Sequence, residues 1–195
     1  MDRRIILASG SPRRKELLEM LGLKFDIMVD NTPEEKGDCS EPETVVCRLA
    51  GFKCDNVAKQ IHGEECIIIA ADTVVAIDNE ILGKPSNEED ACAMLCKLGG
   101  NLHFVYTGVC IKDLCTKKEV CFCEKTKVFF KNLDIQEIKD YINTGEPMDK
   151  AGSYGIQNLG ALFVEKIEGD YFNVVGLPLC KLGQALKRDF GVNLF

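Results

Sequence analysis

The chain has 195 residues, of which 46% are hydrophobic and 28% are charged, and its formal net charge is −7. This composition excludes a disordered protein, because a chain of this length buries enough apolar surface to fold as one large domain or two small lobes. The most apolar segment, residues 66–77, is shorter than the roughly 20 residues of a membrane span and contains Asp72. The acidic balance also argues against broad binding to nucleic acid or to an anionic membrane, since both need a basic surface.

The N-terminus and the cysteines indicate a cytoplasmic protein. Arg3 and Arg4 precede an apolar run at 5–8 that is shorter than the roughly 7 to 15 apolar residues of a secretory signal. The cysteines number 11, an odd count, and none has the paired CxxC spacing of structural zinc. We therefore interpret most of them as reduced thiols, either buried in the core or incidental.

The first half of the chain alternates apolar runs of strand length with segments of helical period. A strand at 5–8 leads through a Ser-Gly-Ser-Pro loop into a helix that ends at Gly22, with Ser11 at the N-cap and Pro12 at the first helical position. The pattern then predicts, in order, a strand at 25–29, an acidic loop, a helix at 43–60, a buried strand at 66–71 that ends at Asp72, and two short strands at 74–77 and 81–82 around a turn at 78–79.

The second half continues the alternation. The predicted elements are a helix at 86–99 with a capping box that starts at Ser86, strands at 104–112 and 120–130, a capped helix from Asp134 to Gly145, a glycine-rich segment at 149–160, strands at 162–167 and 171–175, and a helix at 179–190. Interleaved strands and helices predict an α/β protein with a central mixed, twisted sheet and flanking helices. Because the chain has no internal repeat and no long linker, the simplest organisation is a single domain over residues 1–195.

The loop at 9–12 leads into a helix whose first turn carries Arg13, Arg14 and Lys15. Cations at a helix N-terminus are unfavourable by themselves, because the helix dipole is positive there. An anion would neutralise them, and arginine can bind phosphate through two parallel hydrogen bonds. The motif is not a Walker A loop, since no Gly-Lys-Ser/Thr follows. It predicts either a phosphate-binding loop or a capped helix with its arginines in solvent.

Asp72 follows the buried strand predicted at 66–71, with Thr73 beside it. In open α/β sheets, ligands bind outside the carboxyl ends of the strands. A carboxylate at such a position can bind a divalent ion or take a proton from water. The alternative is an aspartate that caps the next turn. Thr73 shares the location and both interpretations.

Other candidates are charged residues elsewhere in the chain. Glu34 and Glu35, in the acidic loop, offer a second carboxylate for a metal or are simply solvated. Lys53, on a predicted helix, and Lys84, between a glycine and a proline, are phosphate contacts or ordinary surface lysines.

The segment 150–157, KAGSYGIQ, combines features suited to a nucleotide base. Its glycines allow close backbone approach, Tyr154 offers a stacking face, and Gln157 offers a donor and an acceptor for a base edge. The alternative is an ordinary glycine-containing loop. The segment 173–178 has no titratable group, and we assign it no chemistry.

Short motifs occur in a fixed order along nearly the whole chain. They are LASGSPRR at 7–14, LAGFK at 49–53, AADTVV at 70–75, LGKP at 82–85, HFVYTGV at 103–109, DKAGSYGIQ at 149–157 and GDYFNVVGLP at 169–178. With these motifs the sequence resembles the Maf family, also called septum formation inhibitor Maf, whose members are nucleoside triphosphate pyrophosphatases.

The resemblance implies a house-cleaning hydrolase that converts a nucleoside triphosphate to its monophosphate and pyrophosphate with a divalent cation, Mg²⁺ or Mn²⁺. The implied fold is an elongated α/β protein with a central mixed sheet and a cleft between two lobes. Gln157 in GSYGIQ, together with Thr73 after the aspartate, resembles the subgroup that acts on dTTP and UTP, and modified pyrimidine nucleotides stay open as substrates.

The same resemblance implies roles for individual residues. Asp72 matches the proton acceptor, and Asp72 and Glu35 would hold the metal, with Glu34 as the alternative to Glu35. The positions linked to substrate choice are Arg13, Thr73 and Gln157. The other active-site positions are Ser9, Arg14, Lys53 and Lys84.

Two other classes of function stay open. A non-catalytic nucleotide-binding regulator of cell division would use the same arginines and glycines but would not need Asp72 as a base. A cysteine-based redox or metal protein would need tight zinc or a thiol with a lowered pKa. A nucleoside triphosphate is the partner that we predict, without nucleic acid or membrane, and homodimer formation is left open.

Overall fold

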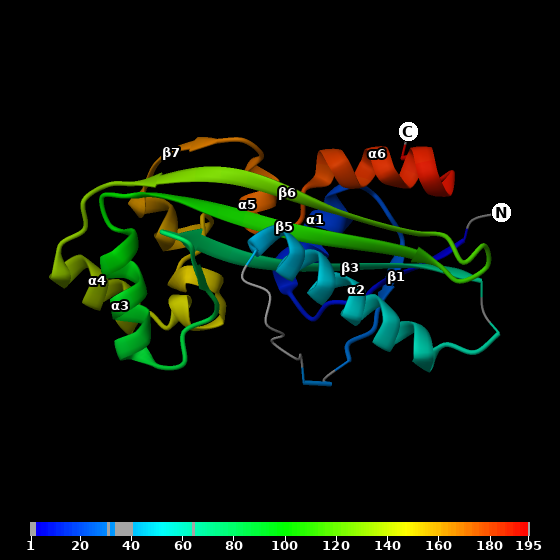
Figure 1. Ribbon diagram of the computed structural model, residues 1–195, viewed down its shortest axis with the longest axis horizontal. Coiled ribbons are helices and arrows are strands. Elements are labelled where there is room, and N and C mark those ends of the chain that lie inside the picture. Colours follow the sequence, from blue (N-terminus) through cyan, green and yellow to red (C-terminus); the bar gives the residue numbers. More distant parts are fainter. Residues whose placement is uncertain (1–2, 31, 34–40, 64, 195) are drawn as a thin grey trace. The chain divides into compact units, whose positions relative to one another are not determined.

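The computed structural model describes residues 3–30, 32–33, 41–63 and 65–194, and the structural statements below concern these residues. Helices and strands alternate along them (Figure 1). The elements are β1 (Arg4–Leu7), α1 (Pro12–Met20), β2 (Phe25–Ile27), α2 (Pro42–Gln60), β3 (Cys66–Ile77), β4 (Glu80–Leu82), α3 (Glu88–Leu98), β5 (Leu102–Asp113), β6 (Glu119–Phe130), α4 (Ile135–Asn143), the 3-10 turns η1 (Glu146–Asp149), η2 (Ala151–Ser153) and η3 (Asn158–Phe163), β7 (Val164–Glu168), α5 (Tyr171–Val175) and α6 (Leu179–Phe190). Within this described part, no helix combines the length and the apolar character needed to cross a membrane.

The strands form a seven-stranded mixed sheet in the order β2-β1-β3-β5-β6-β7, with β4 beside β3. β1 is parallel to both β2 and β3, with Leu7 opposite Ile27 and Ile69, and α1 and α2 supply the crossovers that parallel pairing needs. β4 runs antiparallel to β3, and β7 runs antiparallel to β6. The predicted fold class, an α/β protein with a mixed sheet and helices, is confirmed.

The chain divides into two compact units whose boundaries fall within β3, β5 and β6 and directly after α5. The first unit comprises Met1–Asp72, Thr107–Glu124 and Gly176–Phe195, and the second comprises Thr73–Tyr106 and Lys125–Val175. The single domain over residues 1–195 and the cleft between two lobes stay predictions.

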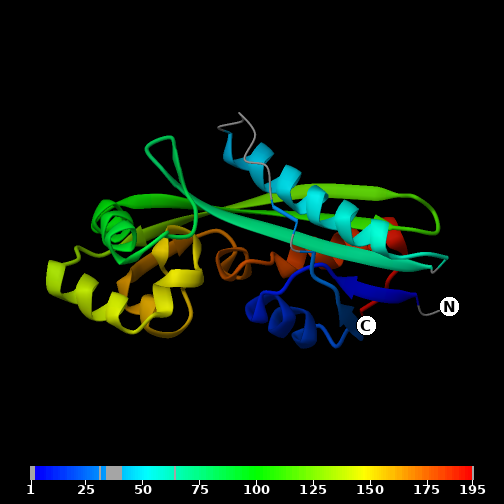
Figure 2. The same cartoon turned by 90° about the horizontal axis from the view of Figure 1, so that it is seen from below.

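In the first unit, α2 packs against β1, β3 and β5 (Figure 2). The closest approach is at Gly108 of β5, where a side-chain carbon would lie 2.4 Å from the carbonyl carbon and oxygen of Val46 on α2. Because only a glycine fits against that backbone, β5 carries a glycine in its interior. The buried cluster between α2 and the strands consists of Ile6, Ala8, Ala50, Cys54, Val57, Cys66, Ile68, Ala70 and Cys110.

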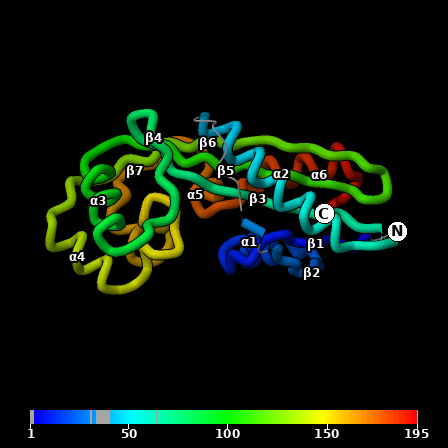
Figure 3. The backbone as a smooth tube through the Cα atoms, turned by 60° about the horizontal axis from the view of Figure 1, so that its bottom comes forward, coloured from blue at the N-terminus to red at the C-terminus, as the bar shows by residue number. Residues whose placement is uncertain are grey.

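The second unit is built around a cluster of aromatic rings. Phe130 contacts His103, Tyr154 and Phe163 edge to face, at ring-centre distances of 4.8, 4.6 and 5.9 Å. His103 and Tyr154 are also joined by a 2.8 Å hydrogen bond between the ring nitrogen Nε2 and the hydroxyl. Helices α3 and α4 lie against each other (Figure 3). Both contribute buried side chains to the core around these rings.

The ends of α3 and α4 follow the capping residues of the sequence. α4 begins after Asp134, whose side chain accepts amide hydrogen bonds from the first turn in a capping box, as predicted. α3 ends before Gly99, also as predicted, but its N-cap is Asn87 rather than Ser86. The Asn87 side chain accepts the amide hydrogen of Asp90 at 2.8 Å, while Ser86 donates to the Asp90 carboxylate from outside the helix.

The predicted end of the central strand at Asp72 is wrong. β3 continues through Asp72 to Ile77, because its second half pairs with β4. The tight turn between β3 and β4 is at Asp78 and Asn79, as predicted, and both have positive φ angles of 50° and 62°.

The strand predicted at 171–175 is also wrong, because these residues form helix α5. Their β-branched and aromatic side chains favour a strand. Hydrogen bonds hold the helical turn instead: the Asp170 carboxylate accepts from the Phe172 amide at 2.8 Å, and the buried Asn173 amide donates to the Val105 carbonyl at 3.0 Å.

Gly108→Ala is expected to lower the free energy of unfolding by about 2 to 3 kcal/mol, because the new methyl group must push α2 away from β5. The control is Gly51→Ala, on α2, where an added carbon meets nothing within 4 Å. Since alanine favours a helix interior more than glycine does, the free energy of unfolding of this variant is expected to rise by about 0.5 to 1 kcal/mol. Urea unfolding followed by circular dichroism checks both values, and shifts of the same sign would contradict the packing described here.

His103 is expected to make stability depend on pH. Burial lowers its pKa from 6.5 to about 4, so between these values the unfolded chain binds more protons than the folded chain. The free energy of unfolding should therefore fall as pH drops from 6.5 to 4, by up to about 3 kcal/mol. Denaturant unfolding across this range gives the slope of the free energy of unfolding against pH. This slope should be smaller in His103→Phe than in wild type and unchanged in the exposed control His62→Gln. Equal slopes in wild type and His103→Phe would refute the assignment.

Candidate active site

The loop after β1 is organised by Ser9, which is buried. Its hydroxyl oxygen accepts from the Ser11 amide at 3.3 Å and from Arg14 Nη1 at 3.2 Å. Ser11 occupies the N-cap of α1 and Pro12 the first helical position, as predicted, but the Ser11 side chain makes no capping hydrogen bond. The serine that structures the loop is therefore Ser9 rather than the N-cap residue.

Arg14 is held from two sides at the start of α1. Its Nε donates to the Gly176 carbonyl at 2.8 Å, and its Nη1 donates to Ser9. Because a guanidinium is planar, these two contacts fix the direction in which the rest of the group points. Gly176 lies in a segment to which the sequence assigns no chemistry, since a backbone carbonyl leaves no signal in the residue types.

Asp72 and Lys53 form an ion pair in the first unit. Lys53 Nζ lies 2.5 Å from Asp72 Oδ1, and the two side chains are 24% and 16% exposed, respectively. Side chains alternate along a strand, and Ile68 and Ala70 of β3 belong to the cluster under α2. Asp72 continues that face beyond the cluster, which brings its carboxylate to Lys53 of the same helix.

The loop at 9–11 and Asp72 both follow the parallel pairing of β1 and β3. Leu7 pairs with Ile69 in the parallel ladder of β1 and β3, and the Ala8 amide still donates to the Ile69 carbonyl at 2.8 Å. Ligands of open α/β sheets bind at the carboxyl ends of parallel strands. Asp72 does not end its own strand, but it lies three residues beyond Ile69, the partner of the last residue of β1.

The first unit therefore combines cations with a carboxylate. Arg13 is half-buried in the first turn of α1, next to Arg14 and at the positive end of the helix dipole. Among the residues that the structure describes, no group of three acidic, histidine or cysteine ligands includes Asp72. Glu35 and its alternative Glu34 lie outside the described residues, so their part in a metal site stays a prediction.

The remaining predicted residues, Thr73, Lys84 and Gln157, belong to the second unit. Thr73 is half-buried on β3, and Lys84 is exposed after β4. The Gly83 carbonyl accepts from the Gly152 amide at 3.0 Å, which ties the Lys84 loop to the glycine-rich segment. Gln157 lies on that segment, half-buried at the N-cap of η3.

Tyr154 does not offer the stacking face predicted for it. Its side chain is only 5% exposed, and its ring packs against His103 and Phe130. Burial raises the pKa of its hydroxyl, which is hydrogen-bonded to His103. Tyr154 is therefore a core residue of the second unit.

The glycine-rich segment is held by Glu146, a residue that the sequence does not single out. Its Oε1 accepts from the Tyr141 hydroxyl at 3.0 Å and from the Gly160 amide at 3.2 Å, and its Oε2 accepts from the Leu159 amide at 3.3 Å. The Tyr141 hydroxyl in turn accepts from the Gly155 amide at 3.3 Å. One carboxylate thus fixes the backbone on both sides of the glutamine predicted to bind a base.

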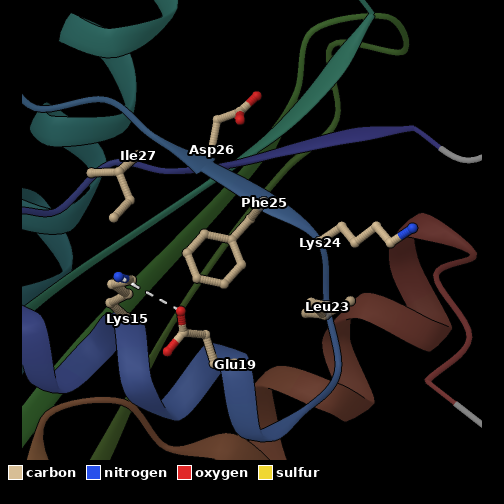
Figure 4. Close-up of a pocket in the computed structure, with 7 residues that line it drawn as sticks. All are labelled: Lys15, Glu19, Leu23, Lys24, Phe25, Asp26 and Ile27. Atoms are coloured by element: carbon tan, nitrogen blue, oxygen red, sulfur yellow. Dashed lines mark ion pairs between the residues drawn. The ribbon is translucent and has the colours of Figure 1, made fainter.

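A hollow beside α1 and β2 lies apart from these residues (Figure 4). The ion pair of Lys15 and Glu19, at 3.7 Å, lies on its α1 side. Of the three cations predicted at the start of α1, only Lys15 lines it. The lining consists of Lys15, Glu19, Leu23, Lys24, Phe25, Asp26 and Ile27.

Known proteins match this chain along nearly its whole length. A protein of Caldanaerobacter subterraneus subsp. tengcongensis named dTTP/UTP pyrophosphatase is 52% identical over 97% of this chain and 90% of its own. One of the same name from Alkaliphilus metalliredigens is 49% identical over 98% of both chains. Among solved structures, the Staphylococcus aureus Ham1 protein is 15% identical, with a TM-score of 0.48 over 66% of this chain and 72% of that one. Since residues 4–189 also match the family of Maf-like proteins, the chain belongs to the Maf family.

Proposed function

We propose that the protein hydrolyses nucleoside triphosphates, dTTP and UTP among them, to the monophosphate and pyrophosphate. The observation that carries the proposal is the ion pair of Lys53 and Asp72, in the same unit as the Arg14 guanidinium that Ser9 and the Gly176 carbonyl hold. Cations that can bind phosphate and a carboxylate that can activate water thus belong to one unit. Relatives with 49% and 52% identity are named for this activity, which supports the substrate class.

Asp72 is the proton acceptor in this proposal. Water attacks the α-phosphorus, its proton passes to the carboxylate, and pyrophosphate leaves. Lys53 holds Oδ1 of Asp72 and so orients the carboxylate. We assign its ammonium group, which carries three hydrogen-bond donors, to a phosphate oxygen of the bound substrate.

The start of α1 supplies charge for the phosphates. Negative charge on the phosphate oxygens is stabilised by Arg13, Arg14 and the positive end of the helix dipole. Ser9 acts by positioning Arg14, because its hydroxyl oxygen accepts a hydrogen bond from Arg14 Nη1. We assign Lys84 to a further phosphate contact.

The donor type fits a divalent cation such as Mg²⁺ or Mn²⁺. Mg²⁺ in phosphate-transfer sites is held by one or two carboxylates together with substrate phosphates and water, so few protein ligands are needed. Asp72, a partly exposed carboxylate, and Glu35 would hold it. When bound, the ion supplies positive charge that neutralises the triphosphate.

Gln157 selects the base in this proposal. Its amide offers an acceptor for the N3–H and a donor for the O4 of uracil or thymine, and cytosine presents the opposite pattern at these two positions. Arg13 and Thr73 are assigned to the same choice of substrate. Selection by hydrogen bonds replaces the stacking on Tyr154, which is buried.

Asp72→Asn is expected to lower kcat for pyrophosphate release from UTP about 10²- to 10⁴-fold, because asparagine keeps the shape but cannot take the proton. Pyrophosphate release is measured with Mg²⁺, with Mn²⁺ and with chelator. The control is Asp78→Asn, in the exposed β3–β4 turn, where asparagine tolerates the φ of 50° and wild-type activity is expected.

If Asp72→Asn kept the turnover of the wild type, Asp72 would not be the general base. Tight nucleotide binding by the natural protein without turnover of any triphosphate would contradict hydrolysis and support the non-catalytic regulator.

Gln157→Ala is expected to lower kcat/KM for UTP about 10- to 100-fold and to change that for CTP far less, since only uracil loses matched hydrogen bonds. The control is Asn158→Gly, at the next residue, where a φ of 57° suits glycine. An unchanged UTP/CTP ratio in Gln157→Ala would show that the base is read elsewhere.

A further inference from the structure

A cluster of two thiols and a carboxylate lies on the hairpin of β5 and β6. The cluster consists of Cys110, Glu119 and Cys121, whose ligand atoms all lie within 4.8 Å of one another. All three residues belong to the first unit, and none has a part in the hydrolysis proposed above. We refer to them as the thiol cluster.

The hairpin register explains why the two cysteines meet. At the turn, the Asp113 amide donates to the Lys118 carbonyl at 2.9 Å. Counting back from this antiparallel pair puts Cys110 of β5 opposite Cys121 of β6. Opposite residues in an antiparallel pair point to the same face of the sheet, so both thiols lie on one face.

The two carboxylate oxygens of Glu119 have different partners. Its Oε1 faces the thiols, at 3.7 Å from Cys110 Sγ and 3.8 Å from Cys121 Sγ. Its Oε2 is 2.9 Å from Lys112 Nζ, and Lys112 is paired in addition with Asp55 of α2. The ion pair therefore fixes the carboxylate with one oxygen aimed at both sulfurs.

Burial and charge in the cluster suit a bound cation. Cys110 is buried, whereas Cys121 and Glu119 are exposed, so an ion can enter from solvent. Two thiolates beside a carboxylate repel one another, and a cation bound among them removes that penalty.

We propose that Cys110, Glu119 and Cys121 bind one thiophilic divalent cation of the zinc class, with a fourth position open to water. Zn–S bonds of about 2.3 Å in a tetrahedral site place two sulfurs about 3.8 Å apart, which the cluster accommodates. Lys112 orients the carboxylate ligand, as residues behind a metal ligand commonly do. The two sulfur donors distinguish this site from an oxygen-ligand site for Mg²⁺.

The test is a titration of the reduced, full-length protein with Co²⁺, without nucleotide. One equivalent is expected to produce the sulfur-to-cobalt absorption of a tetrahedral thiolate site, and Zn²⁺ should abolish it. Cys121→Ser, at an exposed position, should lose most of this absorption. Glu119→Gln should keep the absorption but bind Co²⁺ at least tenfold more weakly.

Two controls separate this site from other thiols and from hydrolysis. Cys180→Ser removes an exposed thiol of the same unit on α6 and should titrate like wild type. Asp72→Asn should also leave the absorption unchanged, so the result stands whether or not the protein hydrolyses nucleotides.

Absence of the thiolate absorption in the wild type, or its persistence in Cys121→Ser, would overturn the proposal. A competing use of the same pair is a disulfide. Air oxidation that removes two titratable thiols from wild type but not from Cys121→Ser, with no cobalt absorption after reduction, would establish the disulfide and refute the metal site.

Discussion

The close packing of α2 against β5 is the constraint on which the described chemistry of the first unit depends. Because Gly108 has no side chain, the backbone of α2 lies directly against the strand. The rest of the helix is then set relative to the sheet: Lys53 reaches Asp72, and the Cys54 thiol donates to the carbonyl of Cys110 at 3.3 Å. One helix in one position thus supplies the partner of the carboxylate and the packing behind the thiol cluster.

Placing Asp72 inside a continuous strand has an energetic consequence. A carboxylate that is only 16% exposed loses much of its hydration, and the ion pair with Lys53 offsets that loss. The same pairing orients the group for chemistry. Removing either partner leaves the other charge partly buried, so Asp72 and Lys53 matter for folding as well as for the proposed reaction. Asparagine at position 72 is therefore a better probe of chemistry than alanine, because it fills the same space without a charge.

Much of the fold follows from local sequence signals. The helical period of α2 and α6 and the capping box at Asp134 predict their elements, and the motifs mark the loops that carry the candidate site. Signals of this kind do not report partners distant in the chain. Residues 171–175 favour a strand locally, yet Asn173 binds groups on β5 and β6, and the turn is helical. The Gly176 carbonyl holds Arg14, which is distant in the chain. The Glu146 carboxylate holds backbone amides of the following loop. Residue types alone reveal neither contact.

In the reaction that we propose, water attacks the α-phosphorus of a pyrimidine nucleoside triphosphate. Hydrolysis of UTP in water enriched in ¹⁸O, followed by mass spectrometry of the products, tests it most directly. Attack on the α-phosphorus predicts one ¹⁸O atom in UMP and none in pyrophosphate. Label in pyrophosphate would place the attack on the β-phosphorus, release of inorganic phosphate in place of pyrophosphate would identify a different reaction, and either result would contradict the account.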